Sequence, residues 1–149
     1  HKMYQFTNQH VIVTGGTRGI GAGLTESFLK AGATVVATYS GNDEAARNFK
    51  EKLSIYGDKL VLKKFNVASS SEVENFFKEY ETQFPSLEVL VNNAGIRRDS
   101  IVASMSENDW DEVIDTNLKG TYNLTRFGVL TMMKNRYGRI VNMSSVGGK

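Results

Sequence analysis

The sequence predicts a doubly wound α/β fold, in which helices cover both faces of a parallel sheet. Short apolar runs alternate with segments of helical periodicity along the chain, which is the pattern of repeated strand–helix–strand units. The apolar runs are nearly continuous rather than alternating with polar residues, as is typical of strands covered on both sides. The length of 149 residues suits one domain.

The first strand and helix follow from their local pattern. An apolar run at 10–14 predicts a buried strand, and Ile20, Leu24 and Phe28 then recur at helical spacing. Gly32 is a typical residue just after a helix end. By the same criteria we expect strands at 34–39, 60–65, 87–91 and 139–143, and helices at 19–31, 44–56 and 107–136.

Two details of the helices are also predicted. Ser71 and Glu74 have the spacing of a capping box, so the third helix should begin near them, and Pro85 should close it. We expect the long helical pattern at 107–136 to be broken or bent. Trp110, Val113, Ile114, Leu118 and Thr121 should form its inward stripe, with Asn117 on the same side.

The composition excludes several classes of protein. A net charge of +2, with 23% charged residues, is too small to favour nucleic acid or a membrane surface as a partner. No apolar run approaches the roughly 20 residues of a spanning helix, and we expect a cytoplasmic protein. The chain has no Cys, and neither His1 nor His10 has an acidic pattern nearby, so we expect no metal site.

The residues that follow the strands indicate where a ligand binds. In open α/β sheets, ligands bind beyond the carboxyl ends of the strands. Gly, Asn and Ser are common in any loop, but five such ends favour a long ligand lying across the sheet. The segments concerned are 15–21, 40–42, Asn66, 92–95 and 144–148.

The first of these loops gives the sharpest signal. Its glycines allow a tight turn that brings a helix N-terminus against a pyrophosphate, where free N–H groups and the helix dipole favour an anion. A glycine loop alone can be a plain turn. Here it lies between a buried strand and an amphipathic helix, which is the context that nucleotide binding requires.

Four motifs carry a resemblance to a known family. Gly15, Gly19 and Gly21 in the segment 14–21 (TGGTRGIG) resemble the glycine motif of short-chain dehydrogenases/reductases, and 92–95 (NNAG) resembles their second motif. Asn117 and Ser145 lie in stretches similar to the family's active-site segments. The resemblance extends from about Phe6 to Gly148. Within the family, 93–99 and 132–139 resemble bacterial 3-oxoacyl-[acyl-carrier-protein] reductases most, with acetoacetyl-CoA reductases a close alternative.

The resemblance implies a Rossmann-type sheet and a set of dinucleotide contacts. Asn66 replaces the Asp that is more usual before the Val of the third loop, and an amide contact to adenine remains possible with Asn. The contacts implied are Gly15, Thr17, Arg18, Gly19, Ile20, Gly21, Ser40, Asn66, Val67, Asn93, Ala94 and Gly95.

The end of the second strand favours NADP(H) over NAD. An NAD enzyme usually has an acidic residue about 20 residues past the glycine loop, which binds the ribose hydroxyls. Here the strand ends in Thr38-Tyr39-Ser40, without an acid, and Arg18 lies in the first loop. Asp43 is the one nearby carboxylate that could favour NAD instead.

The catalytic residues are implied by the resemblance. Asn117 would hold a water in a proton relay, and Ser145, rather than Ser144, would bind the substrate carbonyl. From the residues alone, Asn117 could equally be a satisfied core amide and Ser145 an ordinary loop serine. The family's Tyr and Lys should follow the serine on the next helix, beyond Lys149. We therefore expect residues 1–149 to be the N-terminal, dinucleotide-binding part of one longer domain and to be inactive alone.

The activity implied is NADPH-dependent reduction of a 3-oxoacyl thioester to the 3-hydroxyacyl thioester in fatty acid synthesis, by a homotetramer. Lys134, Arg136 and Arg139 form a basic cluster that could steer an acidic acyl carrier protein. Cations at a helix C-terminus are also ordinary partners of its dipole. An alternative of another class is a non-catalytic dinucleotide-binding module.

Overall fold

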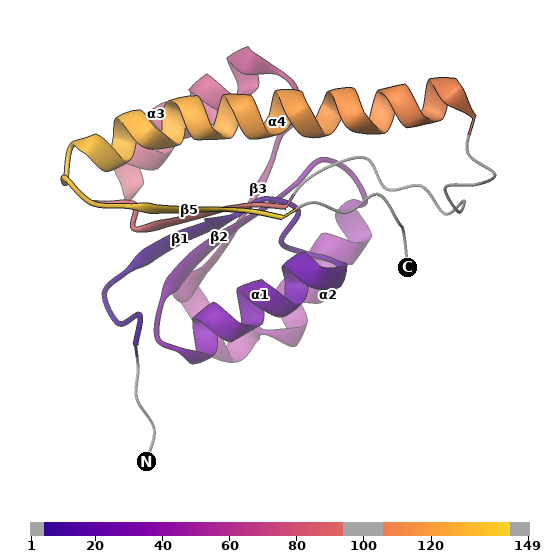
Figure 1. Cartoon of the computed structure of the whole chain (residues 1–149). Helices are drawn as coiled ribbons and strands as arrows, with labels where there is room; N and C mark the ends of the chain where they lie inside the picture. The colour runs from indigo at the N-terminus through magenta and orange to yellow at the C-terminus, as the bar shows by residue number, and fades with distance from the viewer. Residues whose placement is uncertain (1–4, 94–105, 144–149) are drawn as a thin grey trace.

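A computed structural model describes residues 5–93 and 106–143, and Figure 1 shows the arrangement of its elements. Strands and helices alternate along the chain, as expected. The strands are β1 (His10–Val13), β2 (Thr34–Tyr39), β3 (Leu60–Lys64), β4 (Val89–Asn92) and β5 (Arg139–Asn142). The helices are α1 (Gly19–Lys30), α2 (Asp43–Lys52), the 3₁₀ helix η1 (Ser54–Lys59), α3 (Ser70–Gln83) and α4 (Glu107–Met133).

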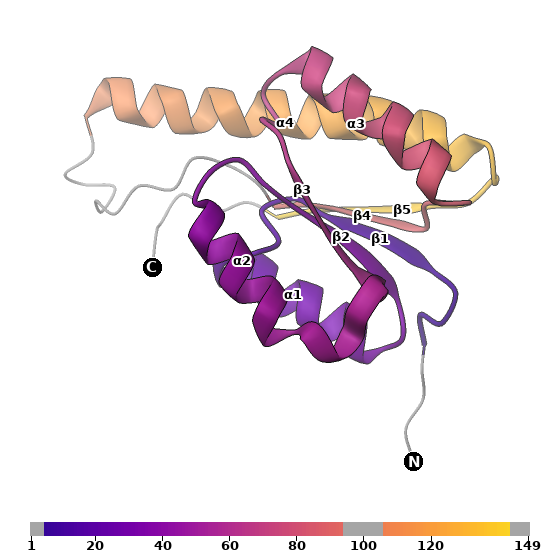
Figure 2. The ribbon, with the colours of Figure 1, turned by 180° about the vertical axis from the view of Figure 1, so that it is seen from behind.

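The sheet confirms the doubly wound prediction. Its strand order is β3-β2-β1-β4-β5, and every neighbouring pair is parallel. Helices α1 and α2 cover one face, and α3 and α4 cover the other, as Figures 1 and 2 show from opposite sides. The chain changes direction across the sheet between β1 and β4. In open α/β sheets, this switch point is where ligands bind.

The strands are buried on both faces of the sheet, so each contributes side chains to two hydrophobic cores, one on either side. Along β1, Ile12 packs on the side of α3 and α4, whereas Val11 and Val13 pack on the side of α1 and α2. This follows from the two-residue period of a strand. The aromatic side chains of α3 lie in the first core, where Phe76 stacks on Phe65 with ring centroids 4.6 Å apart.

The predicted start of α3 is wrong by two residues. Ser69, not Ser71, is the N-cap, and its Oγ accepts a hydrogen bond from the Glu72 amide at 3.3 Å. The Glu72 carboxylate in turn accepts from the amide of Asn66 at 3.0 Å. Two serine–glutamate pairs share the same spacing, and the turn after β3 selects the earlier one.

Two further helix predictions need correction. The segment predicted as one helix at 44–56 ends at Lys52 and continues as η1, which contains Gly57 at φ +54°. The long helix is not broken: α4 is continuous over 27 residues. At about 1.5 Å per residue it spans roughly 40 Å.

The inward face of α4 also differs from the prediction. Val113 is buried, but Trp110 and Leu118 are 37% and 65% exposed. Two glycines on α4 lie against the core and let the helix approach it closely. The larger side chains Trp110 and Leu118 therefore lie away from this contact. The buried residues of α4 are Val113, Gly120, Asn123, Leu124, Gly128, Thr131 and Met132.

Candidate functional site

The glycine loop connects β1 directly to α1 and leaves the N-terminus of that helix open. Gly15 and Gly19 have φ values of +61° and +54°, which favour glycine. Arg18 is the N-cap, yet no side chain caps the helix, and its first turn contains no acidic residue. The first N–H groups of an α-helix have no partner inside the helix. The loop therefore offers backbone donors and a favourable dipole to an anionic group.

Three side chains fix the shape of this loop from behind. Thr14 Oγ1 accepts from the Asn93 amide at 2.8 Å, and Asn93 Nδ2 donates to the Gly15 carbonyl at 3.3 Å. Thr25, fully buried on α1, donates its hydroxyl to the Gly16 carbonyl at 2.9 Å. A Cβ at Gly21 would overlap the Gly15 carbonyl and the Asn93 side chain. The ends of β1 and β4 and the start of α1 are thus held together at the switch point.

The other predicted contacts of the first two loops surround the open helix end. Thr17 is buried, whereas Arg18 is exposed and Ile20 is 56% exposed. Ser40 is exposed directly after β2. The side chains of Arg18, Ile20 and Ser40 are accessible at the carboxyl edge of the sheet, where the sequence predicted them.

Asp43, the carboxylate that could favour NAD, has a cationic partner. Its side chain lies 3.1 Å from Lys64 Nζ, between the start of α2 and the end of β3. Both side chains are about half exposed, so the pair contributes little stability. The lysine nevertheless offsets the negative charge of Asp43 on this side of the site.

Asn66 and Val67 form the turn after β3. Asn66 Oδ1 accepts from the Ala68 amide at 3.0 Å, while its Nδ2 has no hydrogen bond with any residue in 5–93 or 106–143. Val67 is 7% exposed and belongs to the core beneath α3 and α4. The turn therefore exposes the Asn66 side chain and is anchored by the buried Val67.

Sequence reasoning missed two residues that touch this turn. Asn123 Nδ2 donates to the Val67 carbonyl at 3.0 Å, and a Cβ at Gly120 would lie 2.7 Å from Val67 Cγ2. A glycine within a helix pattern was the available signal, since its cost in a helix interior requires a reason. Nothing in the local sequence indicates that Asn123 reaches the turn after β3.

Asn117 lies half-buried on α4, and its side chain forms no hydrogen bond with another described residue. Ser145, Ala94 and Gly95 lie outside the described residues, so the predicted pairing of Asn117 with Ser145 is not tested.

A buried asparagine holds β5 to the rest of the sheet. Asn92 Nδ2 donates to Asn142 Oδ1 at 2.8 Å and to Thr125 Oγ1 at 3.3 Å, which links β4, β5 and α4. Its Oδ1 is buried and has no hydrogen-bond partner among residues 5–93 and 106–143. The side chain therefore fixes the position of β5, from which the predicted Ser145 follows.

The basic cluster lies at the opposite edge of the sheet, at the C-terminal end of α4. Lys134 Nζ is 2.5 Å from Glu81 Oε1, and Thr131 donates to Glu81 Oε2 at 2.7 Å. Hydrogen bonds from Lys134 and Thr131 hold the pKa of Glu81 below its ordinary value. Arg136 and Arg139 are exposed and form no ion pair with the described residues.

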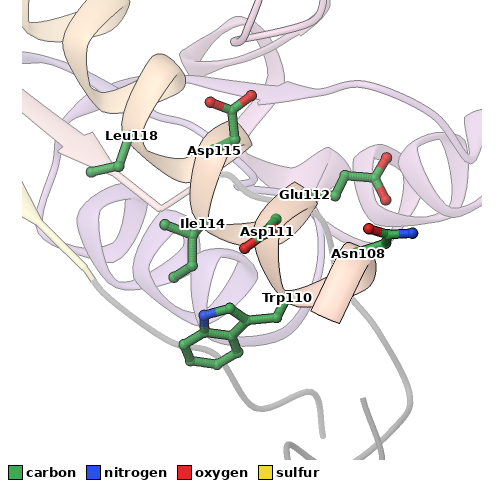
Figure 3. A pocket seen from close by; sticks show the side chains of 7 residues that line it. All are labelled: Asn108, Trp110, Asp111, Glu112, Ile114, Asp115 and Leu118. Atoms are coloured by element: carbon green, nitrogen blue, oxygen red, sulfur yellow. The ribbon is translucent and has the colours of Figure 1, made fainter. Parts of the chain in front are cut away.

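One surface hollow of about 570 Å³ lies along the N-terminal part of α4 (Figure 3). All of its described lining residues belong to this helix, and none of them belongs to the glycine loop. Trp110, Ile114 and Leu118 lie at four-residue spacing within it, beside acidic side chains.

Two absences apply to residues 5–93 and 106–143 alone. In these ranges no helix combines the length and apolar character needed to cross a membrane. They also contain no group of three or more His, Asp or Glu side chains arranged to hold a metal ion.

Comparisons with known proteins agree with the site. A family profile described as short chain dehydrogenase matches residues 9–149. The chain is 44% identical over 138 residues to an acetoacetyl-CoA reductase of Paracoccus denitrificans, covering 93% of this chain and 55% of the relative. It is 42% identical over 137 residues to a 3-oxoacyl-[acyl-carrier-protein] reductase FabG of Staphylococcus aureus, covering 92% of this chain and 56% of the relative.

The same kind of reductase from Aquifex aeolicus is 40% identical over 92% of this chain and 55% of the relative. The chain thus spans little more than half the length of these relatives. The profile match covers nearly all of the chain, including the glycine loop and the strand ends that surround it. The chain therefore belongs to the short-chain dehydrogenase family.

Proposed function

We propose that this chain is the dinucleotide-binding part of an oxidoreductase that reduces a 3-oxoacyl thioester with NADPH. The observation that carries the proposal is the open N-terminus of α1, tied through Thr14 and Asn93 to the end of β4 at the switch point. The names of the relatives supply the substrate class, because acetoacetyl-CoA and 3-oxoacyl-carrier substrates are both 3-oxoacyl thioesters.

The residues present fit such a cofactor. The N–H groups at the start of α1 would bind the pyrophosphate, and glycines in the loop leave room for it. Asn66 and Val67 would bind the adenine, and Arg18 and Ser40 would surround the phosphorylated ribose. When bound, the nicotinamide supplies a hydride, and the protein's part is to hold and orient it.

NADPH is favoured over NADH by the charges around the ribose. Arg18 is exposed, no carboxylate follows β2 directly, and Lys64 neutralises Asp43. Ser40→Asp should lower NADPH affinity and favour NADH, because a carboxylate repels a 2′-phosphate and accepts from free ribose hydroxyls. Arg18→Ala should weaken NADPH about ten-fold, as for a lost charged hydrogen bond, and leave NADH nearly unchanged. A wild-type preference for NADH would contradict the assignment.

The reacting end is proposed to lie beside Asn117. Ser145 would donate a hydrogen bond to the substrate carbonyl, and Asn117 would hold a water that feeds the proton relay. The family's Tyr and Lys would come from further along the protein, with the Tyr acting as the general acid. Intact mass and sequence of the natural protein test this directly. A natural chain without a Tyr-x-x-x-Lys pair would instead support a non-catalytic dinucleotide-binding module.

The carrier of the substrate is proposed to be an acyl carrier protein. Arg136 and Arg139 are exposed cations suited to an acidic partner, whereas Lys134 already pairs with Glu81. The decisive assay compares NADPH oxidation by the full-length protein with acetoacetyl groups on carrier protein and on coenzyme A. Arg136→Glu should raise KM for the carrier substrate several-fold and leave KM for the coenzyme A substrate unchanged. Equal effects on both substrates would contradict carrier docking.

We also propose that the protein forms a homo-oligomer, namely the homotetramer that the family resemblance implies. The outer face of α4 exposes Leu118, Tyr122, Leu130 and Met133. Acidic residues occupy 107–115 of this helix, and between 116 and 143 the only charged residues are basic. If the α4 helices of two copies paired antiparallel, the acidic part of each would face the basic part of the other, and the exposed apolar side chains would be covered. Light scattering tests this, with Leu118→Glu expected to reduce the assembly; a monomeric wild type would refute it.

A further inference from the structure

Helix α4 holds the turn between β3 and α3 from above, and the proposed function does not account for this contact. Asn123, 5% exposed, donates from Nδ2 to the Val67 carbonyl at 3.0 Å. The hydrogen bond joins residues 56 positions apart in the sequence and is buried. Such a bond is costly to break, because the carbonyl left behind has no water to replace the lost donor.

The remaining hydrogen bonds of this turn are internal. The Asn66 amide donates to Glu72 Oε1, the Ala68 amide to Asn66 Oδ1 and the Ser69 amide to the Asn66 carbonyl. These bonds determine the shape of the turn but not its position over the sheet. The Val73 amide on the adjoining helix also donates to the Ser69 carbonyl, and among the described residues Asn123 is the only one outside residues 66–73 that forms a hydrogen bond with residues 66–69.

Gly120 determines how closely the helix approaches. It is buried one turn before Asn123, and a Cβ there would lie 2.7 Å from Val67 Cγ2 and 3.3 Å from Val67 Cβ. Either α4 or the turn would have to move to admit that methyl group. The glycine therefore allows α4 close enough to Val67 for the short Asn123 side chain to reach the carbonyl.

We propose that Asn123 and Gly120 are positioning residues for the adenine end of the dinucleotide. They hold the Asn66–Val67 turn against α4, so that the exposed side chain of Asn66 stays at a fixed distance from the glycine loop. The inference rests on the proposed dinucleotide site and specifies which tertiary contact gives that site its adenine affinity. Neither residue contacts the cofactor in this assignment; both act through Val67.

The test measures binding of the two halves of the cofactor separately. The variants are Gly120→Ala, which inserts a methyl group against Val67, and Asn123→Leu, which removes the donor at similar size. Gly128→Ala is the matched control. It is on the same helix, and its Cβ would meet Leu90 Cδ2 at 2.8 Å, a core side chain remote from the turn. The probes are 2′,5′-ADP, reduced nicotinamide mononucleotide and NADPH, titrated by calorimetry into the full-length protein.

Gly120→Ala and Asn123→Leu should each weaken 2′,5′-ADP and NADPH about ten-fold, the effect of losing one buried hydrogen bond. Neither should change the affinity for reduced nicotinamide mononucleotide. Gly128→Ala should lower the melting temperature and leave 2′,5′-ADP affinity unchanged. Equal weakening of both halves, or 2′,5′-ADP affinity at the wild-type level in a folded variant, would overturn the proposal.

Hydrogen exchange of the wild-type protein provides a second measurement should the variants fail to fold. Binding of 2′,5′-ADP should slow exchange in residues 66–69 and in 120–124 of α4, but not in 128–132. Protection confined to the turn would overturn the coupling to α4. A wild-type protein that binds neither NADPH nor 2′,5′-ADP would refute the proposed function itself, whereas normal binding with unaffected variants would refute the positioning role alone.

Discussion

The polar groups at the two edges of the sheet differ in how many hydrogen bonds they form within the protein. At the amino edge, polar side chains are paired with one another. The His10 amide donates to Glu88 Oε1 at 2.5 Å, Ser86 Oγ lies 3.2 Å from His10 Nδ1, and the Tyr80 hydroxyl donates to the Ser86 carbonyl at 2.6 Å. At the carboxyl edge, the first turn of α1 has no side-chain cap, and Arg18 and Ser40 are exposed.

The difference separates stability from ligand binding. The polar groups at the amino edge already form hydrogen bonds within the protein and have few donors or acceptors left for a ligand. Removing one of these bonds should therefore lower the stability of the fold. Burial, with the charge of Glu88 adding to it, raises the pKa of Tyr80 above its ordinary value, so the phenol remains a hydrogen-bond donor at neutral pH. The open donors at the carboxyl edge should affect binding. The predictions below test this division, beginning with the largest expected effect.

Gly21→Ala should reduce dinucleotide affinity by about 100-fold or more, equivalent to ~2.7 kcal/mol. The new methyl group would overlap the Gly15 carbonyl and the Asn93 side chain and displace the loop. Gly23→Ala is the control, because a Cβ there meets nothing within 4 Å. It should keep full affinity and gain about 0.5–1 kcal/mol of stability from helix propensity. Titration calorimetry with NADPH measures the affinity of both variants. A Gly21→Ala protein with normal affinity would contradict the geometry.

Thr25→Val should affect folding and binding together. The substitution keeps the side-chain shape but leaves the Gly16 carbonyl without its buried donor, at a cost of about 1–3 kcal/mol in unfolding free energy. Dinucleotide affinity should fall as well, since this bond positions the glycine loop. Thr25→Ser retains the hydroxyl and should keep most of the affinity. Denaturant unfolding and NADPH titration give the two values; a loss of stability without any loss of affinity would refute the link.

Tyr80→Phe should lower stability alone. Removing the hydroxyl deletes its bond to the Ser86 carbonyl at the amino edge and should cost about 1 kcal/mol. Chemical denaturation measures the cost. NADPH affinity of the folded variant should equal that of the wild type, and a clear loss would show that the two edges are not independent.

Glu81→Gln should have the smallest effect and a defined pH dependence. The pKa of Glu81 is lowered in the folded state, mainly by hydrogen bonds from Lys134 and Thr131, so its contribution is present at neutral pH and is lost as pH falls through the folded-state pKa. Because the pair is largely exposed, the contribution should not exceed about 0.5 kcal/mol. Stability curves of wild type and variant should converge in acid; a gap that widens there would contradict the assignment.

Local patterns were sufficient for the parallel sheet and for the glycine loop. Continuous apolar runs can be satisfied only by burial on both faces, and the glycines at positive φ are local requirements of the turn. Sequence patterns gave a wrong prediction where two neighbouring residues fitted the same local motif equally well. Ser69 and Ser71 are both followed three residues later by glutamate, and only the turn after β3 decides between them.

The face of α4 shows the same limit. Of its predicted inward stripe, Trp110 and Leu118 are exposed, whereas Val113 is buried together with the face that carries Gly120 and Gly128. Periodicity identifies an apolar stripe but not the surface that a helix meets, and close packing against Val67 and Leu90 requires small residues.

The sequence by itself thus determined that this protein has strands with carboxyl ends rich in glycine and amides, and a glycine loop that leads into a helix after the first of them. Those properties depend on neighbours in the chain. Only the tertiary structure decided that Asn93 supports the glycine loop and that Asn123 holds the Val67 turn, because each bond joins residues more than fifty positions apart and depends on how helices pack on the sheet.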